Sequence, residues 1–207
     1  MSKGATPTRL TDRKRAAILE AAVAEFRQSG YEATSMDRIA ATAGVSKRTV
    51  YNHFPGKDVL FAEILQLLLE RSRDGLDLAY RSDAPLRPQL LELVRQKLAL
   101  FQDPHFTDLA RVAIAAAIHS PELAQKMVAR MGEREEGLTT WVRAATADGR
   151  LETQDPLFAC MQLQALVKGV AFWPQLTLSQ PPLDAAQQAH VADHAVGMFL
   201  AYYARGD

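Results

Sequence analysis

The stretch that decides the fold is residues 34–57, with the sequence TSMDRIAATAGVSKRTVYNHFPGK. A short apolar segment leads to Gly44, and the segment after it carries basic and polar side chains. No acidic residue occurs from Arg38 to Lys57. Two short helices joined at a glycine turn, the second of them cationic, are typical of a helix-turn-helix that inserts its second helix into the major groove of DNA.

Apolar spacing divides the second helix into an inner and an outer side. Val50 and Phe54 are four residues apart, which predicts that both face the core. Ser46 is a suitable cap for the start of this helix, and Pro55-Gly56 ends it. The remaining side chains are predicted to point outward, and they are Lys47, Arg48, Thr49, Tyr51, Asn52 and His53.

Charge is distributed unevenly along a chain whose formal net charge is zero. Residues 1–60 hold ten Lys and Arg against six Asp and Glu, a net charge of +4. Residues 61–207 hold fourteen against eighteen, a net charge of −4. This asymmetry indicates that only the N-terminal part of the protein meets a polyanion.

Composition also excludes several classes of protein. The chain has one cysteine, Cys160, so an intramolecular disulfide is impossible. No apolar run approaches the roughly 18 residues that a membrane helix needs. Glu20 and Glu25 interrupt the apolar stretch behind the basic N-terminus, which argues against a signal peptide. We therefore expect a soluble, cytoplasmic protein with no membrane partner.

The sequence offers little support for a metal, a cofactor or catalysis. His190 and His194 have the i,i+4 spacing of metal ligands, with Asp193 between them, but no thiol or carboxylate cluster accompanies them. We expect no metal and no cofactor. A helical small-molecule enzyme remains a remote alternative, because the chain has no phosphate-binding loop and no evident nucleophile–base pair.

Helical periodicity and breaker residues predict an all-α fold of about nine helices. Residues 1–10 are expected to form a flexible basic arm, residues 11–56 a three-helix DNA-binding head, and residues 57–207 a larger helical domain. Thr11 is the predicted cap of the first helix. The fourth helix is predicted to run from Lys57 to about Ala79, some 23 residues. Later helices are expected after Pro88, over residues 106–119, from Ser120 to Gly149, from Asp155 to Pro174, and after Pro182.

Residues 18–64 resemble the TetR/AcrR family of bacterial transcriptional regulators. The resemblance rests on A-x3-F at residues 22–26, GYEATS at 30–35, IAATAGVS at 39–46, TVYNHF at 49–54 and KDVL at 57–60. Two later segments, FTDLARVAIAAAIHSPELAQKM at 106–127 and KGVAFWP at 168–174, resemble the AefR-like C-terminal domains of that family. This resemblance implies a regulator that binds double-stranded DNA.

The resemblance and the chemistry of the head together suggest a role for each polar side chain. Tyr51 and His53 resemble the phosphate-contacting pair of the family. Thr34 and Ser35 lie at a predicted helix start, where hydroxyl and free N–H groups can hold a phosphate. Lys57, at the start of the fourth helix, is also suitably placed for a phosphate.

The first turn of the second helix is expected to approach the bases. Lys47 and Arg48 can reach base edges or flanking phosphates, and arginine on guanine is the commonest specific contact. Thr49 can touch a thymine methyl group. Asn52 is assigned to the same DNA-facing set.

The resemblance implies that the larger domain, residues 57–207, serves effector binding and dimerisation, and this domain is rich in methionine and aromatic residues. In the family, helices after the head enclose a ligand pocket, and an apolar pocket suits a small hydrophobic effector. The candidate pocket residues, each of which can equally be ordinary core, are Phe101, Phe106, His119, Met127, Met131, Trp141, Met161, Phe172 and Trp173. The last two helices are predicted to form a homodimer interface, because the final helix has two adjacent apolar rows. The candidate interface residues are Phe158, Ala165, Gly169, Ala192, Val196, Phe199 and Tyr203.

We therefore expect a ligand-responsive repressor that binds a palindromic operator as a dimer. The alternative is a regulator that activates transcription or needs no ligand. Whether a small molecule releases bound operator distinguishes these hypotheses, and turnover of that molecule would favour an enzyme.

Overall fold

Eleven α-helices make up the part of the chain that the computed structural model describes, residues 10–73, 78–132 and 137–205. In chain order they are α1 (Leu10–Ser29), α2 (Met36–Thr42), α3 (Lys47–His53), α4 (Lys57–Arg73), α5 (Leu86–Gln102), α6 (Pro104–His119), α7 (Pro121–Gly132), α8 (Gly137–Ala147), α9 (Pro156–Ala171), α10 (Trp173–Thr177) and α11 (Ala185–Tyr203). An isolated bridge between Leu151 and Ala204 is the only β-pairing in these ranges. The predicted all-α fold is confirmed.

The described residues form two compact units. The first contains the described residues up to Leu68 together with Asp108–Met127, and the second contains Leu69–Thr107 and the described residues from Val128 onward. The predicted domain boundary lay at residues 56 and 57. The first unit extends beyond it because the buried side of α4 belongs to the core of the head.

That core joins α1, α2, α3 and the first half of α4. Ile18, Ile39, Val50 and Leu60, one from each helix, are fully buried. The predicted inward orientation of Val50 is therefore confirmed. Beside them, three aromatic rings pack together: the Phe26 and Phe61 centroids are 6.2 Å apart, and Tyr31 lies 5.4 and 5.0 Å from them. The burial of Ile39 and Val50 in this core holds α2 and α3, which are too short to be stable alone.

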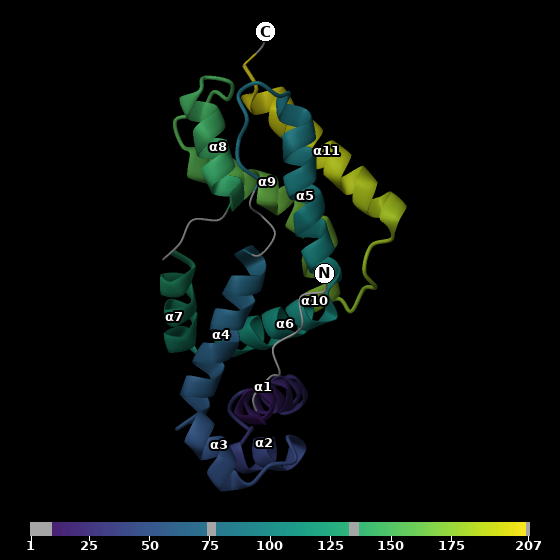
Figure 1. Cartoon of the computed structure of the whole chain (residues 1–207). Helices are drawn as coiled ribbons and strands as arrows, with labels where there is room; N and C mark the ends of the chain where they lie inside the picture. The colour runs from purple at the N-terminus through teal and green to yellow at the C-terminus, as the bar shows by residue number, and fades with distance from the viewer. Residues whose placement is uncertain (1–9, 74–77, 133–136, 206–207) are drawn as a thin grey trace, which may run out of the picture. The chain divides into compact units, whose positions relative to one another are not determined.

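The second unit is centred on α9, which packs against α5, α8, α10 and α11 (Figure 1). Its core includes Leu90, Trp141 and Leu163, all almost completely buried. The Trp141 indole Nε1–H donates to Gln89 Oε1 over 3.2 Å. Gln89 also accepts from the backbone N–H of Arg81 over 2.9 Å. The buried Trp141 indole and the Gln89 amide of this core therefore have partners.

The fourth helix is shorter than predicted. It ends at Arg73 after 17 residues, and residues 78–80 are not helical. Residues 74–77 lie outside the described ranges. Farther along the chain, the Gln89 amide and the Arg150 guanidinium bind backbone carbonyls of residues 81–85, which holds residues 81–85 in a loop before α5.

Two further helices account for the difference between nine and eleven. The single helix predicted from Ser120 to Gly149 is represented by α7 and α8, and residues 133–136 between them lie outside the described ranges. Pro174 was expected to end a helix, but it lies in the first turn of α10, where a missing N–H has no cost. Thr11 lies inside α1 instead of capping it. Of the predicted arm, residues 1–9 lie outside the described ranges.

Candidate nucleic-acid interface and effector cavity

The turn between α2 and α3 is closed by Gly44. Its φ of +65° is a left-handed conformation that strains residues with a Cβ. The Gly44 N–H donates to Ala41 O and the Val45 N–H to Ala40 O, each over 3.1 Å, so the last carbonyls of α2 are satisfied. The chain then turns immediately into α3, as the sequence predicts for a helix-turn-helix.

The exposed side of α3 is polar and cationic. Ser46 caps the helix by accepting from the Thr49 N–H over 3.1 Å, and its hydroxyl lies 2.8 Å from that of Thr49. Val50 is the buried residue of α3. Lys47, Arg48, Tyr51 and Asn52 are exposed, and Thr49 and His53 are half-buried. The structure therefore presents the predicted side chains together on the surface of one short helix.

An acidic residue next to this surface forms an ion pair with one of its lysines. Lys47 Nζ lies 2.6 Å from an oxygen of Asp37 on α2, and both side chains are largely exposed. Asp37 falls one residue before the acid-free stretch. A phosphate would compete with this carboxylate for the Lys47 ammonium. The sequence alone does not reveal this competition, because the Lys47–Asp37 distance depends on how α2 and α3 are packed.

Thr34 and Ser35 differ in a way that corrects the sequence prediction. Ser35 is exposed and is the N-cap of α2, accepting from the Arg38 N–H over 3.3 Å. Thr34 is only 3% exposed. Its hydroxyl donates to Gly30 O over 2.8 Å and to Glu25 O over 3.2 Å. A buried hydroxyl that already binds the backbone is unavailable to a phosphate, so Thr34 has a structural role.

Lys57 holds the loop before α2. Its ammonium donates to Tyr31 O over 2.7 Å and to Glu32 O over 3.1 Å, and it lies 4.4 Å from the centre of the Tyr31 ring. Burial, with the nearby carboxylates of Asp58 and Glu32, raises the pKa of Tyr31. The ring therefore stays neutral at physiological pH. Two of the three ammonium protons of Lys57 are used inside the head, and one is left for a phosphate.

Glu25 is a buried carboxylate that the sequence analysis did not assign to the site. Its Oε1 accepts from the Thr42 hydroxyl over 2.7 Å, and its Oε2 lies 2.8 Å from an Arg38 guanidinium nitrogen. Both partners are on α2, so this acid on α1 fixes the orientation of α2. Nothing in the linear sequence marks the pairing, because it joins residues 13 and 17 positions apart.

The predicted pocket residues do not line a single space. Phe101, Phe106 and Phe172 form a buried aromatic cluster with centroids 4.8–6.1 Å apart. Trp141 is buried with Gln89, whereas Met161 and Trp173 are exposed. The other three candidates are His119 (exposed), Met127 (half-buried) and Met131, whose side chain lies outside the described part.

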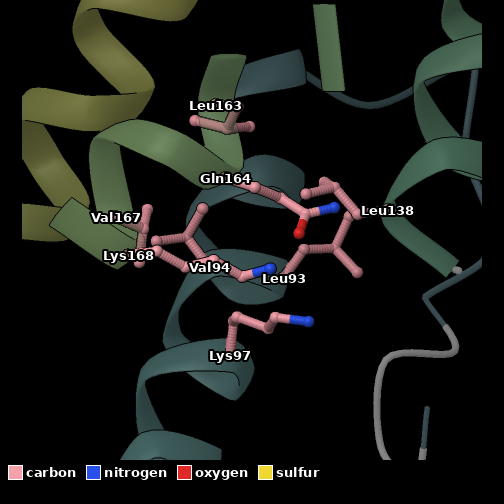
Figure 2. Close-up of a pocket in the computed structure, with 8 residues that line it drawn as sticks. All are labelled: Leu93, Val94, Lys97, Leu138, Leu163, Gln164, Val167 and Lys168. Carbon is pink, nitrogen blue, oxygen red and sulfur yellow. The ribbon is translucent and has the colours of Figure 1, made fainter. Parts of the chain in front are cut away.

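The second unit does contain a cavity, between α5, α8 and α9 (Figure 2). Its volume is about 10 Å³, roughly the space needed for one water molecule. The apolar walls are Leu93, Val94, Leu138, Leu163 and Val167. Three polar side chains complete the lining: Lys97 from α5, and Gln164 and Lys168 from α9. None of these eight was among the predicted pocket residues.

Comparison with known proteins agrees with the helix-turn-helix geometry. A family model described as "Bacterial regulatory proteins, tetR family" matches residues 18–64. A second model, described as "AefR-like transcriptional repressor, C-terminal domain", matches residues 88–205, more than half of the chain. The chain belongs to the TetR family of bacterial regulatory proteins. The resemblance inferred from the sequence is confirmed for both of its parts.

Individual relatives support the same assignment for this TetR-family regulator. The transcriptional regulator RutR of Escherichia coli K12 is 30% identical over 185 residues, covering 85% of each chain. The crystal structure of a TetR-family regulator from Pseudomonas syringae pv. tomato DC3000 is 50% identical, with a TM-score of 0.86, and covers 96% of this chain and 100% of that one. The flavonoid-responsive regulator FrrA is 29% identical, with a TM-score of 0.72. The match covers 94% of this chain and 99% of that one.

The candidate dimer residues of this regulator fall into two groups. Phe158, Ala165 and Gly169 lie on the exposed side of α9. The four candidates on α11 are buried within their own chain, so their assignment to an interface is corrected; they are Ala192, Val196, Phe199 and Tyr203. The α11 row that stays exposed is the other one, with Met198 and Tyr202. Periodicity identified both rows but gave no sign of which one the core would cover.

The remaining sequence features of the regulator carry no further site. His190 and His194 have ring centroids 4.0 Å apart, but Asp193 between them pairs with Arg87 over 2.5 Å. Among the described residues, no group of three or more His, Cys, Asp or Glu side chains gathers as metal ligands do. Cys160 is buried. Across the same residues, no helix is long and apolar enough to cross a membrane.

Proposed function

We propose that this regulator binds a palindromic double-stranded DNA operator as a homodimer and that a small apolar effector releases it. The observation that carries the proposal is the exposed face of α3. Its polar and basic side chains stand on a helix held from behind by Val50, in a segment without acids. Such a helix supplies both phosphate and base contacts in the major groove.

Within this proposal, the side chains of the head have separate roles. Lys47 and Arg48, in the first turn of α3, contact base edges and flanking phosphates, and Thr49 and Asn52 add polar or methyl contacts to bases. Tyr51, His53 and Ser35 bind phosphates. Lys57 contributes one N–H. The full or partial exposure of these groups supports the roles, whereas Thr34 is left out because its hydroxyl is buried.

The proposed dimer uses the apolar exposed sides of α9 and α11, two helices that pack against each other. Phe158 and Met161 on α9 are 53% and 57% exposed, and Met198 and Tyr202 on α11 are 59% and 79% exposed. Large exposed apolar side chains that gather on adjacent helices favour association. A second copy of the chain is the proposed occupant, because an inverted-repeat operator needs two heads related by two-fold symmetry.

Release by an effector is supported by the AefR-like repressor model, which matches the C-terminal part, and by the name of FrrA, a flavonoid-responsive protein. The cavity of the second unit has mainly apolar walls. Ligand would release DNA only if it binds the DNA-incompetent form of the dimer more tightly. No cofactor enters this scheme.

The test is selection of bound duplexes from a random library with the full chain. We expect enrichment of an inverted repeat, retained by a protein that sediments as a dimer. Anisotropy titrations on the selected duplex should lose about 10³–10⁵-fold in affinity between roughly 50 and 200 mM salt if six or more phosphates are contacted. No enrichment at low salt, or a monomer at micromolar concentration, would refute the proposal.

A ligand-independent or activating regulator is the second candidate. It would show the same operator binding. It differs in that no effector lowers that binding and that transcription from the selected site rises with protein in a purified transcription assay. Repression that is relieved by a ligand excludes this alternative.

A further inference from the structure

The cavity in the second unit combines apolar walls with an unusual number of cationic groups. Lys97 occupies a core-facing position of α5, because it lies four residues after Leu93 and three after Val94, both buried. It is itself only 7% exposed. Lysine is among the residues least often buried, so a core-facing lysine beside a cavity needs an explanation.

A second helix brings two more polar groups to the same cavity. Gln164 and Lys168 are one helical turn apart on α9, and both are half-buried (Figure 2). Lys168 supplies a second ammonium group, and Gln164 supplies an amide N–H₂, which already donates to Cys160 Sγ over 3.5 Å and can donate a second hydrogen bond. Among the described residues that line the cavity, the charged side chains are therefore both cationic.

Burying an ammonium group has a large desolvation cost, which is lowered when hydrogen-bonded or oppositely charged groups surround it. Interactions within the chain offset part of this cost for all three polar side chains. An anionic ligand would offset more, because it would meet two positive charges in a partly buried site where Coulomb attraction is weakly screened. A neutral ligand would gain only the apolar contacts.

We propose that the effector of this regulator is a small amphipathic carboxylate, whose carboxylate is held by Lys97, Lys168 and Gln164 and whose apolar body lies among Leu93, Leu138 and Leu163. The inference rests on the proposed regulator function, because it names the effector class of that function. A single carboxylate fits better than a phosphate dianion, since five of the eight lining residues are apolar and a dianion is costlier to desolvate.

The size of the cavity adds a mechanism. At about 10 Å³ the space is filled by one water molecule, so a carboxylate with an apolar body enters only if α5, α8 and α9 separate. The ligand therefore binds a second, more open form of this unit and draws the population toward it. Effector binding and rearrangement of the unit are the same event in this account.

The test uses the full-length protein and two matched pairs of probes: octanoate with octan-1-ol, and 4-phenylbutanoate with 4-phenylbutan-1-ol. Binding is measured by titration calorimetry and by tryptophan fluorescence. We expect saturable binding of at least one carboxylate, and binding of its alcohol at least about tenfold weaker. Lys97→Met and Lys168→Met should each weaken carboxylate binding about tenfold or more and leave the alcohol unchanged.

Two further variants serve as controls for this test. Lys126→Met removes an exposed lysine of α7 and should leave carboxylate binding unchanged. Lys97→Arg keeps the charge if Lys97→Met fails to fold, as judged by circular dichroism, and should retain most of the binding. Equal binding of acid and alcohol, indifference to both methionine variants, or no saturable binding of either carboxylate would overturn the proposal.

Operator binding without any probe is measured in parallel, so the two proposals can fail separately. A protein that binds its operator but neither carboxylate keeps the regulator function and loses this effector class. A protein with lysine-dependent carboxylate binding but no operator keeps the site and loses the proposed function.

Discussion

Helices α3 and α9 expose opposite chemistry although each is held in place by a buried apolar side. The seven residues of α3 bury Val50 and expose basic and polar groups. The sixteen residues of α9 bury Ala159, Cys160, Leu163, Val167 and Ala171, and expose Phe158 and Met161. The two buried sides are both apolar and differ only in length. The two exposed sides differ in chemistry, because that of α3 is polar and basic and that of α9 carries large apolar side chains. The exposed side of each helix is therefore what indicates its partner: a polyanion for α3 and an apolar surface for α9.

If the apolar side of α9 joins two copies of the chain, disrupting it should have the largest effect. We expect Met161→Glu to give a monomer by sedimentation and to weaken operator binding roughly 10²–10⁴-fold, because the second head loses its raised effective concentration. Val128→Glu is the matched control, since Val128 is an apolar residue on α7 that is 69% exposed, somewhat more than Met161. If the Met161→Glu variant remains a dimer, the exposed side of α9 does not form the dimer interface.

The exposed side of α3 should give the next largest effect. Arg48→Ala is expected to lower operator affinity by about 1–3 kcal/mol and to relax the base preference at one position of each half-site. Anisotropy with the selected duplex and its single-base variants measures both. Arg95→Ala, which removes an exposed arginine of α5, should leave affinity unchanged. Equal losses in the two variants would show that α3 contributes only general charge.

Thr34 separates a structural role from a contact role inside the head. Thr34→Val removes the donor to two backbone carbonyls, so we expect a loss of about 1–3 kcal/mol in the free energy of unfolding. Thr177→Val removes a similar bond, 2.8 Å to Trp173 O, at an exposed site and should cost less than about 0.5 kcal/mol. Denaturant unfolding gives both values. If a fully folded Thr34→Val variant binds the operator more weakly, Thr34 contacts DNA after all.

The smallest effect should be a gain. Asp37→Asn removes the carboxylate that pairs with Lys47, and an exposed pair of this kind contributes at most about 1 kcal/mol, so operator affinity should rise by less than about fivefold. Glu32→Gln removes an exposed acid that forms no such pair and tests for a general charge effect. A rise of the same size in both variants would mean that the Asp37 ion pair does not compete with DNA.

Much of the head could be predicted from the sequence because its signals are local. Gly44 and Ser46 mark the turn and the cap within three residues, and the spacing of Val50 and Phe54 orients α3. Thr34 was misassigned for the same reason: threonine at a helix start is a common cap, and only the return of its hydroxyl to Gly30 shows that it is buried.

The second unit was harder to predict because its features depend on contacts between distant residues. The connecting segment before α5, for example, is held by Gln89 and Arg150, which bind backbone carbonyls of residues 81–85. The cavity joins α5 to α9 across more than sixty positions of sequence, so neither the Lys97 position nor the Lys168 position is distinctive in its own helix.

The sequence by itself determined the all-α fold, the helix-turn-helix and the family, since periodicity, turn residues and short motifs are properties of neighbouring residues. The tertiary structure alone decided which apolar row of α11 is covered, which lysines are exposed and which are buried, and where the cavity lies. The physical reason is that burial is a property of packing: Lys47 and Lys97 are the same residue type, and only their surroundings separate a surface cation from a lysine in the core.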